Sequence, residues 1–150
     1  MSKINLLSII LITSLLSACG FHTPYKNTSL NASITSTDNN AFTLELKKRF
    51  NSEATQSLAI QVGDEVQKKQ TSSYDSSGKT SSYTLSLSVP VKVFNNNNKL
   101  LLSQDLTAST HLSKMSATQA DRLQIAESYE QLRNTIIKKL LRRLNRLNEN

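Results

Sequence analysis

Apolar residues occupy every second position from residue 83 to residue 93, and mostly small polar residues fill the positions between them. This period of two is typical of a β-strand with one buried face, because successive side chains point to opposite sides of a sheet. Pro90 falls on the polar side and cannot donate a backbone hydrogen bond, which predicts an edge or a bulge at that point. The sequence therefore predicts a sheet with one covered face.

Three further stretches carry strand patterns. Apolar residues alternate at 30–34 and again at 100–112. A third stretch runs from residue 58 to residue 74, and we expect a bulge in it at Gly63 and Asp64. Turn-forming residues separate the last three strands.

Two segments carry the three-and-four spacing of amphipathic helices. The first covers residues 42–54, with an N-cap from Asp38 or a neighbouring asparagine and an ion pair between Glu45 and Arg49. The second begins near Ser116, the first residue of a capping box. Its expected apolar stripe consists of Leu123, Ala126, Tyr129, Leu132, Ile136, Leu140, Leu144 and Leu147.

The order strand, helix, three strands, helix predicts an α+β fold. We expect a two-layer sandwich in which two helices pack on one face of a four-stranded, mostly antiparallel sheet.

The N-terminal residues have the pattern of an export signal. Lys3 precedes a mostly apolar run of roughly 13 residues, whereas a membrane-spanning helix needs about 20. The motif Leu16-Ser17-Ala18-Cys19 matches a lipobox, so we expect residues 1–18 to be cleaved off and Cys19 to carry lipid. An ordinary secreted protein with a lone cysteine is the alternative. Residues 19–150 then form one domain on a short tether, with no cofactor beyond this lipid.

The chain is basic, with a formal net charge of +7 that stays positive when Lys3 is removed. A basic exported protein favours anionic partners, such as the phosphates of lipopolysaccharide, and export argues against nucleic acid. Gly20, after the expected lipid-bearing cysteine, fits release to the outer membrane by analogy with enterobacterial sorting.

Catalytic patterns are missing from the sequence. Only Asp64 and Glu65 are adjacent carboxylates, and neighbours on a strand point to opposite faces. We find no metal-ligand spacing, glycine-rich phosphate loop or Ser/His/Asp arrangement. We therefore expect neither an enzyme nor a metal site.

Two groups of basic residues each allow two interpretations. The group at 138–146 either contacts anionic headgroups or forms a solvated helix face. Lys68, Lys69 and Lys79 flank the predicted turn at 75–78, where they either reach into a partner or protect edge strands.

Three short motifs carry a resemblance to a known family. They are the opening Cys19-Gly20-Phe21-His22, the hairpin set Tyr74, Gly78 and Tyr83, and the helix set Tyr129, Leu132, Ile136 and Lys138-Lys139-Leu140. Together they resemble the LptE family of lipopolysaccharide-assembly lipoproteins, and the element order agrees over nearly all of residues 19–150.

The resemblance implies two helices against a four-stranded sheet, in a lipoprotein that plugs the lumen of the outer-membrane β-barrel LptD. It also implies roles in assembling that barrel and in delivering lipopolysaccharide to the outer leaflet. By the same resemblance, Tyr74, Asp75, Gly78 and Tyr83 in the hairpin contact the barrel.

Lipopolysaccharide contacts carry over less directly. Asp75 stands where family members tend to carry arginine, so Lys79 is the nearest substitute, and Lys114 matches a basic residue near the start of the last helix. Thr23-Pro24 also stands where the family often has Leu-Arg. We expect Lys79 and Lys114 to contact lipopolysaccharide.

Two other functions compete with this one. An unrelated small outer-membrane lipoprotein that scaffolds another envelope complex would share the lipobox and the charge. A periplasmic hydrolase has no supporting set of residues.

Overall fold

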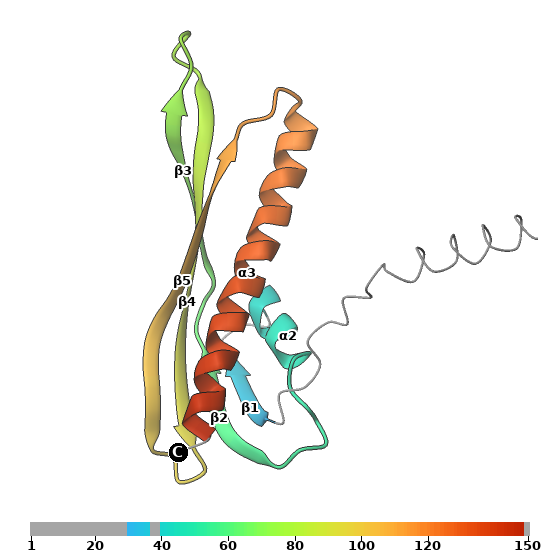
Figure 1. Cartoon of the computed structure of the whole chain (residues 1–150), viewed down its shortest axis with the longest axis vertical. Helices are drawn as coiled ribbons and strands as arrows, with labels where there is room; N and C mark the ends of the chain where they lie inside the picture. The colour runs from blue at the N-terminus through green and yellow to red at the C-terminus, as the bar shows by residue number, and fades with distance from the viewer. Residues whose placement is uncertain (1–29, 37–39, 149–150) are drawn as a thin grey trace, which may run out of the picture.

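The computed structural model describes residues 30–36 and 40–148, which form an α+β fold with two helices and one mixed sheet (Figure 1). Cys19 and Asp38 lie outside the described residues. The elements are β1 (Asn31–Ser36), α2 (Ala41–Lys47), β2 (Gln56–Val62), β3 (Val66–Tyr74), β4 (Thr80–Asn95), β5 (Leu100–Ser113) and α3 (Thr118–Asn148).

Strand β4 is the centre of the sheet. It pairs antiparallel with β5 along one side, and with β2 and β3 along the other. Strand β1 adds to β2 in parallel, so the sheet is mostly antiparallel, as predicted. The apolar face of β4 is buried throughout, which confirms the alternation at Tyr83, Leu85, Leu87, Val89, Val91 and Val93.

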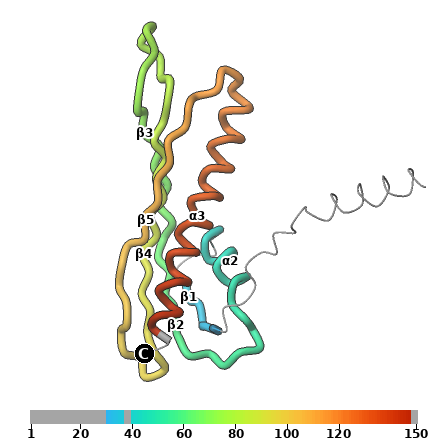
Figure 2. Tube along the Cα trace, in the orientation of Figure 1, coloured from blue at the N-terminus to red at the C-terminus, as the bar shows by residue number. Residues whose placement is uncertain are grey.

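The sheet has five strands where four were expected, because residues 63–65 divide the expected strand 58–74. Strand β2 ends at Val62, opposite Val91, and β3 starts at Val66, opposite Ser88. Two strands, β2 and then β3, thus form hydrogen bonds with the same edge of β4. Figure 2 shows the chain passing from β2 to β3 along β4.

Pro90 faces the break between β2 and β3. Its carbonyl accepts a hydrogen bond from the N–H of Gly63 at 2.9 Å. The N and C=O of one strand residue point to the same side, so the missing N–H of Pro90 also faces the break. A Cβ at Gly63 would lie 3.2 Å from the proline ring, which explains why glycine fits there. The predicted irregularity is therefore an interruption in the neighbouring strand.

The break also fastens the sheet to α3. Arg133 Nε lies 2.8 Å from Glu65 Oε2, and these side chains are 18% and 7% exposed. Burial raises the pKa of Glu65, but hydrogen bonds from Arg133 and Gln67 outweigh it and hold this pKa below its ordinary value. The stability that the ionised carboxylate contributes is therefore lost only as the pH falls through this lowered pKa.

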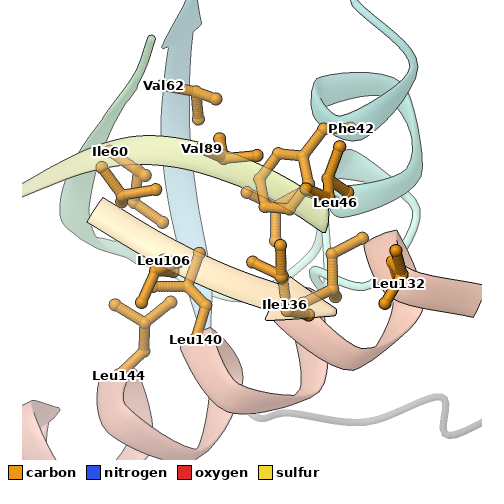
Figure 3. Close-up of a cluster of buried hydrophobic side chains, with 14 of the residues drawn as sticks. Phe42, Leu46, Ile60, Val62, Val89, Leu106, Leu132, Ile136, Leu140 and Leu144 are labelled. Carbon is orange, nitrogen blue, oxygen red and sulfur yellow. The ribbon is translucent and has the colours of Figure 1, made fainter. Parts of the chain in front are cut away.

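The two helices close the core over the apolar face of the sheet (Figure 3). Asn40 caps α2 by accepting from the N–H of Thr43 at 2.9 Å, and the predicted pair of Glu45 and Arg49 forms at 3.0 Å. Helix α2 ends at Lys47, before the expected residue 54. The core side chains in Figure 3 include Phe42, Leu46, Ile60, Val89, Leu106, Ile136, Leu140 and Leu144.

The first turns of α3 depart from the predicted stripe. Leu123 is 62% exposed, and Ala126 is exposed as well. A neighbouring row of the same helix faces the sheet instead, with Asp121 and Ser128 buried and Ile125 packed on the core. Both rows have helical spacing, so periodicity could not separate them. From Tyr129 to Leu144 the stripe is buried as predicted, and Leu147 is partly buried.

Strand β3 carries little of the core. Val66 and Tyr74, expected to continue the apolar pattern, are 58% and 67% exposed. Val66 pairs with Ser88 on the face that the helices leave uncovered. In the described residues, no helix is both long and apolar enough to cross a membrane.

Two leucines on α3 test this burial directly. We expect Leu140→Ala to lower the free energy of unfolding by about 2–5 kcal/mol, because Leu140 is fully buried. Leu123→Ala removes the same atoms from an exposed position and should change it by less than about 0.5 kcal/mol. Urea denaturation followed by circular dichroism measures both, and equal losses would contradict the observed orientation of α3.

Candidate functional site at the hairpin end

Strands β3 and β4 form a hairpin that projects at one end of the molecule (Figure 1). Asp75 Oδ1 organises its turn, accepting hydrogen bonds from the N–H and the hydroxyl of Ser77 and from the N–H of Lys79, at 2.8, 2.7 and 3.0 Å. The hydrogen bond from the Ser77 hydroxyl is the largest cause that lowers the pKa of Asp75. The bond from the Lys79 amide and the charge of Lys114 lower this pKa further. Gly78 has a φ of 77°, a left-handed conformation that favours glycine.

Polar pairs rather than apolar packing hold the hairpin together. The Ser73 hydroxyl lies 2.7 and 2.6 Å from those of Ser81 and Ser82, and the Thr71 and Thr80 hydroxyls are 3.4 Å apart. Besides the backbone ladder between β3 and β4, the contacts across the hairpin near its turn are therefore polar.

A cavity of about 340 Å³ lies between the base of the hairpin and the start of α3. Its lining includes three cationic side chains, those of Lys69, Lys114 and Arg122, and one carboxylate, Asp121. Lys69 Nζ sits 4.7 Å from the centre of the Tyr83 ring, in a cation–π contact. We call this cavity the basic pocket.

The carboxylate of Asp121 points into the protein. The Asp121 side chain is buried; its Oδ1 accepts from the N–H of Met115 at 2.9 Å, and its Oδ2 accepts from the hydroxyl of Tyr83 at 3.4 Å. These contacts fix the entry into α3 and the position of the Tyr83 ring. Burial, and then the charge of Asp121, raise the pKa of Tyr83, so the phenol stays neutral. With its carboxylate engaged, the basic pocket offers three cations to an anionic group.

The predicted lipopolysaccharide residues lie at this end of the molecule. Lys114 lines the basic pocket, and its N–H donates to the carbonyl of Ser81 at 2.9 Å, two residues after Lys79 in the sequence. Lys79 is exposed on the turn. The structure thus brings Lys79 and Lys114 to the same end, with Lys114 inside the pocket and Lys79 beyond it.

The predicted barrel-contact residues divide into two kinds. Tyr74 is 67% exposed, and Asp75 and Gly78 lie in the exposed turn. Tyr83 is 7% exposed and faces α3. A barrel contact by any of these residues remains a prediction.

The sequence alone does not predict two residues of the basic pocket. It places Lys69 only on the flank of the turn, and nothing in its pattern distinguishes Arg122. Lys69 pairs with Leu85, so it shares the covered face of the sheet, and only the strand register reveals this. Arg122 follows the buried Asp121, but its role depends on how the first turns of α3 are rotated.

A sequence model of the LptE family, described as lipopolysaccharide-assembly, matches residues 27–146. The chain belongs to the LptE family. The competing idea of an unrelated lipoprotein thereby loses its basis, and a non-enzymatic role is consistent with this family. A search of curated proteins gives no match.

Solved structures share the LptE-type fold. Rare lipoprotein B from Shewanella oneidensis superposes with a TM-score of 0.68 at 13% identity, covering 78% of this chain and 95% of that one. Lipoprotein B from Nitrosomonas europaea gives a TM-score of 0.64 at 18% identity, covering 80% and 86%. At these identities the likeness concerns the fold alone. Among the described residues of this family member, no cluster of His, Cys, Asp and Glu could hold a metal ion.

The contact between Asp121 and Tyr83 predicts a titration effect. Asp121→Asn removes a negative charge beside the phenol and should lower the pKa of Tyr83 toward its ordinary value. Tyr129 is an internal control, because burial alone raises its pKa. NMR titration of the tyrosine ring carbons measures both, and an unchanged Tyr83 would contradict the contact.

Proposed function

We propose that this LptE-family protein is an outer-membrane lipoprotein that plugs an LptD-type β-barrel and contacts lipopolysaccharide during its delivery to the outer leaflet. In this proposal residues 1–18 are removed, lipid on Cys19 anchors the chain on the periplasmic side, and the domain lies in the barrel lumen and helps the barrel to assemble. The observation that carries the proposal is the family match over residues 27–146.

The basic pocket supports the lipopolysaccharide part. Lipopolysaccharide carries phosphates, and a phosphate is best held by several ammonium and guanidinium donors at once. Lys69, Lys114 and Arg122 supply such donors around one cavity, and Lys79 adds a fourth cation nearby. Lys114 is exposed, so an anion can reach it from solvent.

The projecting hairpin supports the barrel part. A domain inside a water-filled barrel needs a hydrated surface with a few large contact side chains. Strand β3 is exposed along almost its whole length, and its polar side chains pair with those of β4 across the hairpin. Tyr74 is the large exposed side chain next to the turn.

Charge reversal tests the lipopolysaccharide site. We expect Lys69→Glu with Lys114→Glu in the full-length protein to weaken binding to fluorescent lipopolysaccharide by at least tenfold, with a smaller loss for Lys79→Glu. Lys92→Glu with Lys99→Glu is the matched control, because both are exposed lysines away from the hairpin and the net charge changes equally. Equal weakening by this control would mean that net charge alone drives binding, and unchanged affinity of the Lys69 and Lys114 variant would remove the pocket from the site.

Affinity purification of the full-length lipoprotein from detergent-solubilised outer membranes tests the barrel partner. We expect one large β-barrel to co-elute at near-equal stoichiometry. A photocrosslinker at Tyr74 should capture that barrel, whereas one at Leu100, an exposed leucine at the start of β5 far from the hairpin turn, should capture it less. Recovery of the protein alone, or with periplasmic scaffolds only, would contradict the plug.

A further inference from the structure

Strand β5 has one open edge, and the register identifies its open groups. Among the described residues, β5 pairs with β4 and with no other strand. Pro90 points its carbonyl toward the β2–β3 side, so its neighbour Val89 points its backbone groups toward β5. Leu106 pairs with Val89 and points back toward it, so Thr107 points outward. The outward N–H and C=O groups of β5 therefore belong to its odd-numbered residues.

The other edges of this sheet are protected, and β5 is protected less. Strand β3 carries Lys68 and Lys69 and has register irregularities near the hairpin turn, and β1 has only 6 residues. Strand β5 has 14 residues, with Asp105 and His111 as its only ionisable side chains and no proline. Natural sheets protect long edges with lysine, proline or bulges, or cover them. The one register shift of β5, at Leu101, lies near its start. We infer that the edge from Leu102 to Ser113, which lacks these features, is covered in the working state.

A groove borders this edge. A cavity of about 570 Å³ is lined by Thr107, Ser109 and Thr110 of β5 and by Gln131 and Thr135 of α3, among others. The lining is mostly short and polar, so another backbone can come close to the edge. The groove therefore has room and hydrogen-bonding groups for an extended segment beside β5.

Two cationic side chains of α3 contact the part of β5 between Gln104 and Thr107. Lys139 Nζ donates to the outward carbonyl of Thr107 at 3.2 Å, and Arg143 contacts the side-chain oxygen of Gln104. A second copy of this chain centred on the groove would bring two Lys139 ammonium groups together, which is unfavourable. A segment with carboxylates would instead match Lys139 and Arg143.

We propose that the open edge of β5 binds an extended, acidic segment of a partner polypeptide. The segment adds a strand by bonding to the outward backbone groups of Ser109 and His111, which follow Thr107 along β5. Its carboxylates lie against Lys139 and Arg143. This mode of binding takes affinity from backbone bonds and selectivity from side chains. It involves residues outside the basic pocket and does not depend on lipopolysaccharide binding.

A defined peptide tests the proposal on the full-length protein in detergent micelles. The probe is a short capped peptide of alternating threonine and glutamate, and its binding is followed by fluorescence anisotropy. We expect saturable binding that weakens on the order of tenfold in a Lys139→Gln, Arg143→Gln double variant. Absence of saturable binding would overturn the proposal.

Two control peptides separate strand addition from simple charge attraction. The first replaces glutamate with lysine, and the second keeps glutamate but carries N-methyl groups on alternate backbone nitrogens. Neither should bind well, because one has the wrong charge and the other cannot donate the backbone bonds. Equal binding of the methylated peptide would overturn the proposal.

Protein variants locate the binding. Ser109→Pro removes an outward N–H without touching the ladder to β4 and should abolish binding, whereas Ser109→Ala should keep it. Lys114→Ala should also keep peptide binding, and a loss of binding in this variant would assign the peptide to the basic pocket and overturn the proposal.

Amide hydrogen exchange on the unmodified protein does not depend on whether a variant folds. The amides of Ser109 and His111 should slow when peptide binds, while that of Ala108 is already bonded to β4 and should not change; unchanged exchange at all three would refute strand addition.

Discussion

Strand β4 supplies both the backbone bonds and the apolar face on which the rest of the structure depends. Strands β2, β3 and β5 all bond to it, and α3 packs on the side chains that it buries. Its alternation leaves no freedom of register, because a slip by one residue would turn Leu85 and Leu87 to solvent and their serine neighbours into the core. Strand β4 extends beyond the part of the core that α2 helps to close. This extension forms the long hairpin with β3 and continues the long pairing with β5.

The break at residues 63–65 lets two different strands share one side of β4. Strand β2 belongs to the core, with Leu58, Ile60 and Val62 buried, whereas β3 is exposed almost throughout. Pro90 has no N–H to donate to a continuous neighbouring strand, and it lies opposite the break, where no strand residue requires that hydrogen bond. Glu65 then ties the break to Arg133. The ion pair therefore lies at the boundary between an apolar half of the molecule and a polar half.

Sequence reasoning succeeded where a single physical constraint acts. The period of two at residues 83–93 and the helical stripe from Tyr129 to Leu144 both follow from burial of one face, and both are confirmed. It failed where two arrangements satisfy the same constraint. Leu123 and Asp121 lie on alternative rows of α3, and the burial of Asp121 depends on Tyr83 and Met115, which come from other parts of the chain. The basic pocket was only partly foreseen for the same reason, since Lys69 joins it through strand register and Arg122 through the rotation of α3.

The molecule divides into an apolar half and a more polar half. The half with α2, β1 and β2 contains most of the apolar core and so provides most of the stability. In the other half, Tyr83, Leu85 and Leu87 continue the apolar face of β4. Hydroxyl pairs, the buried carboxylate of Asp121 and the turn around Asp75 add polar contacts there. Lys69, Lys114 and Arg122 line the basic pocket in this half, and in the proposed function they hold an anionic ligand. The open edge of β5 runs from one half to the other, and a strand added to it would join the stable core to the half that carries the basic pocket.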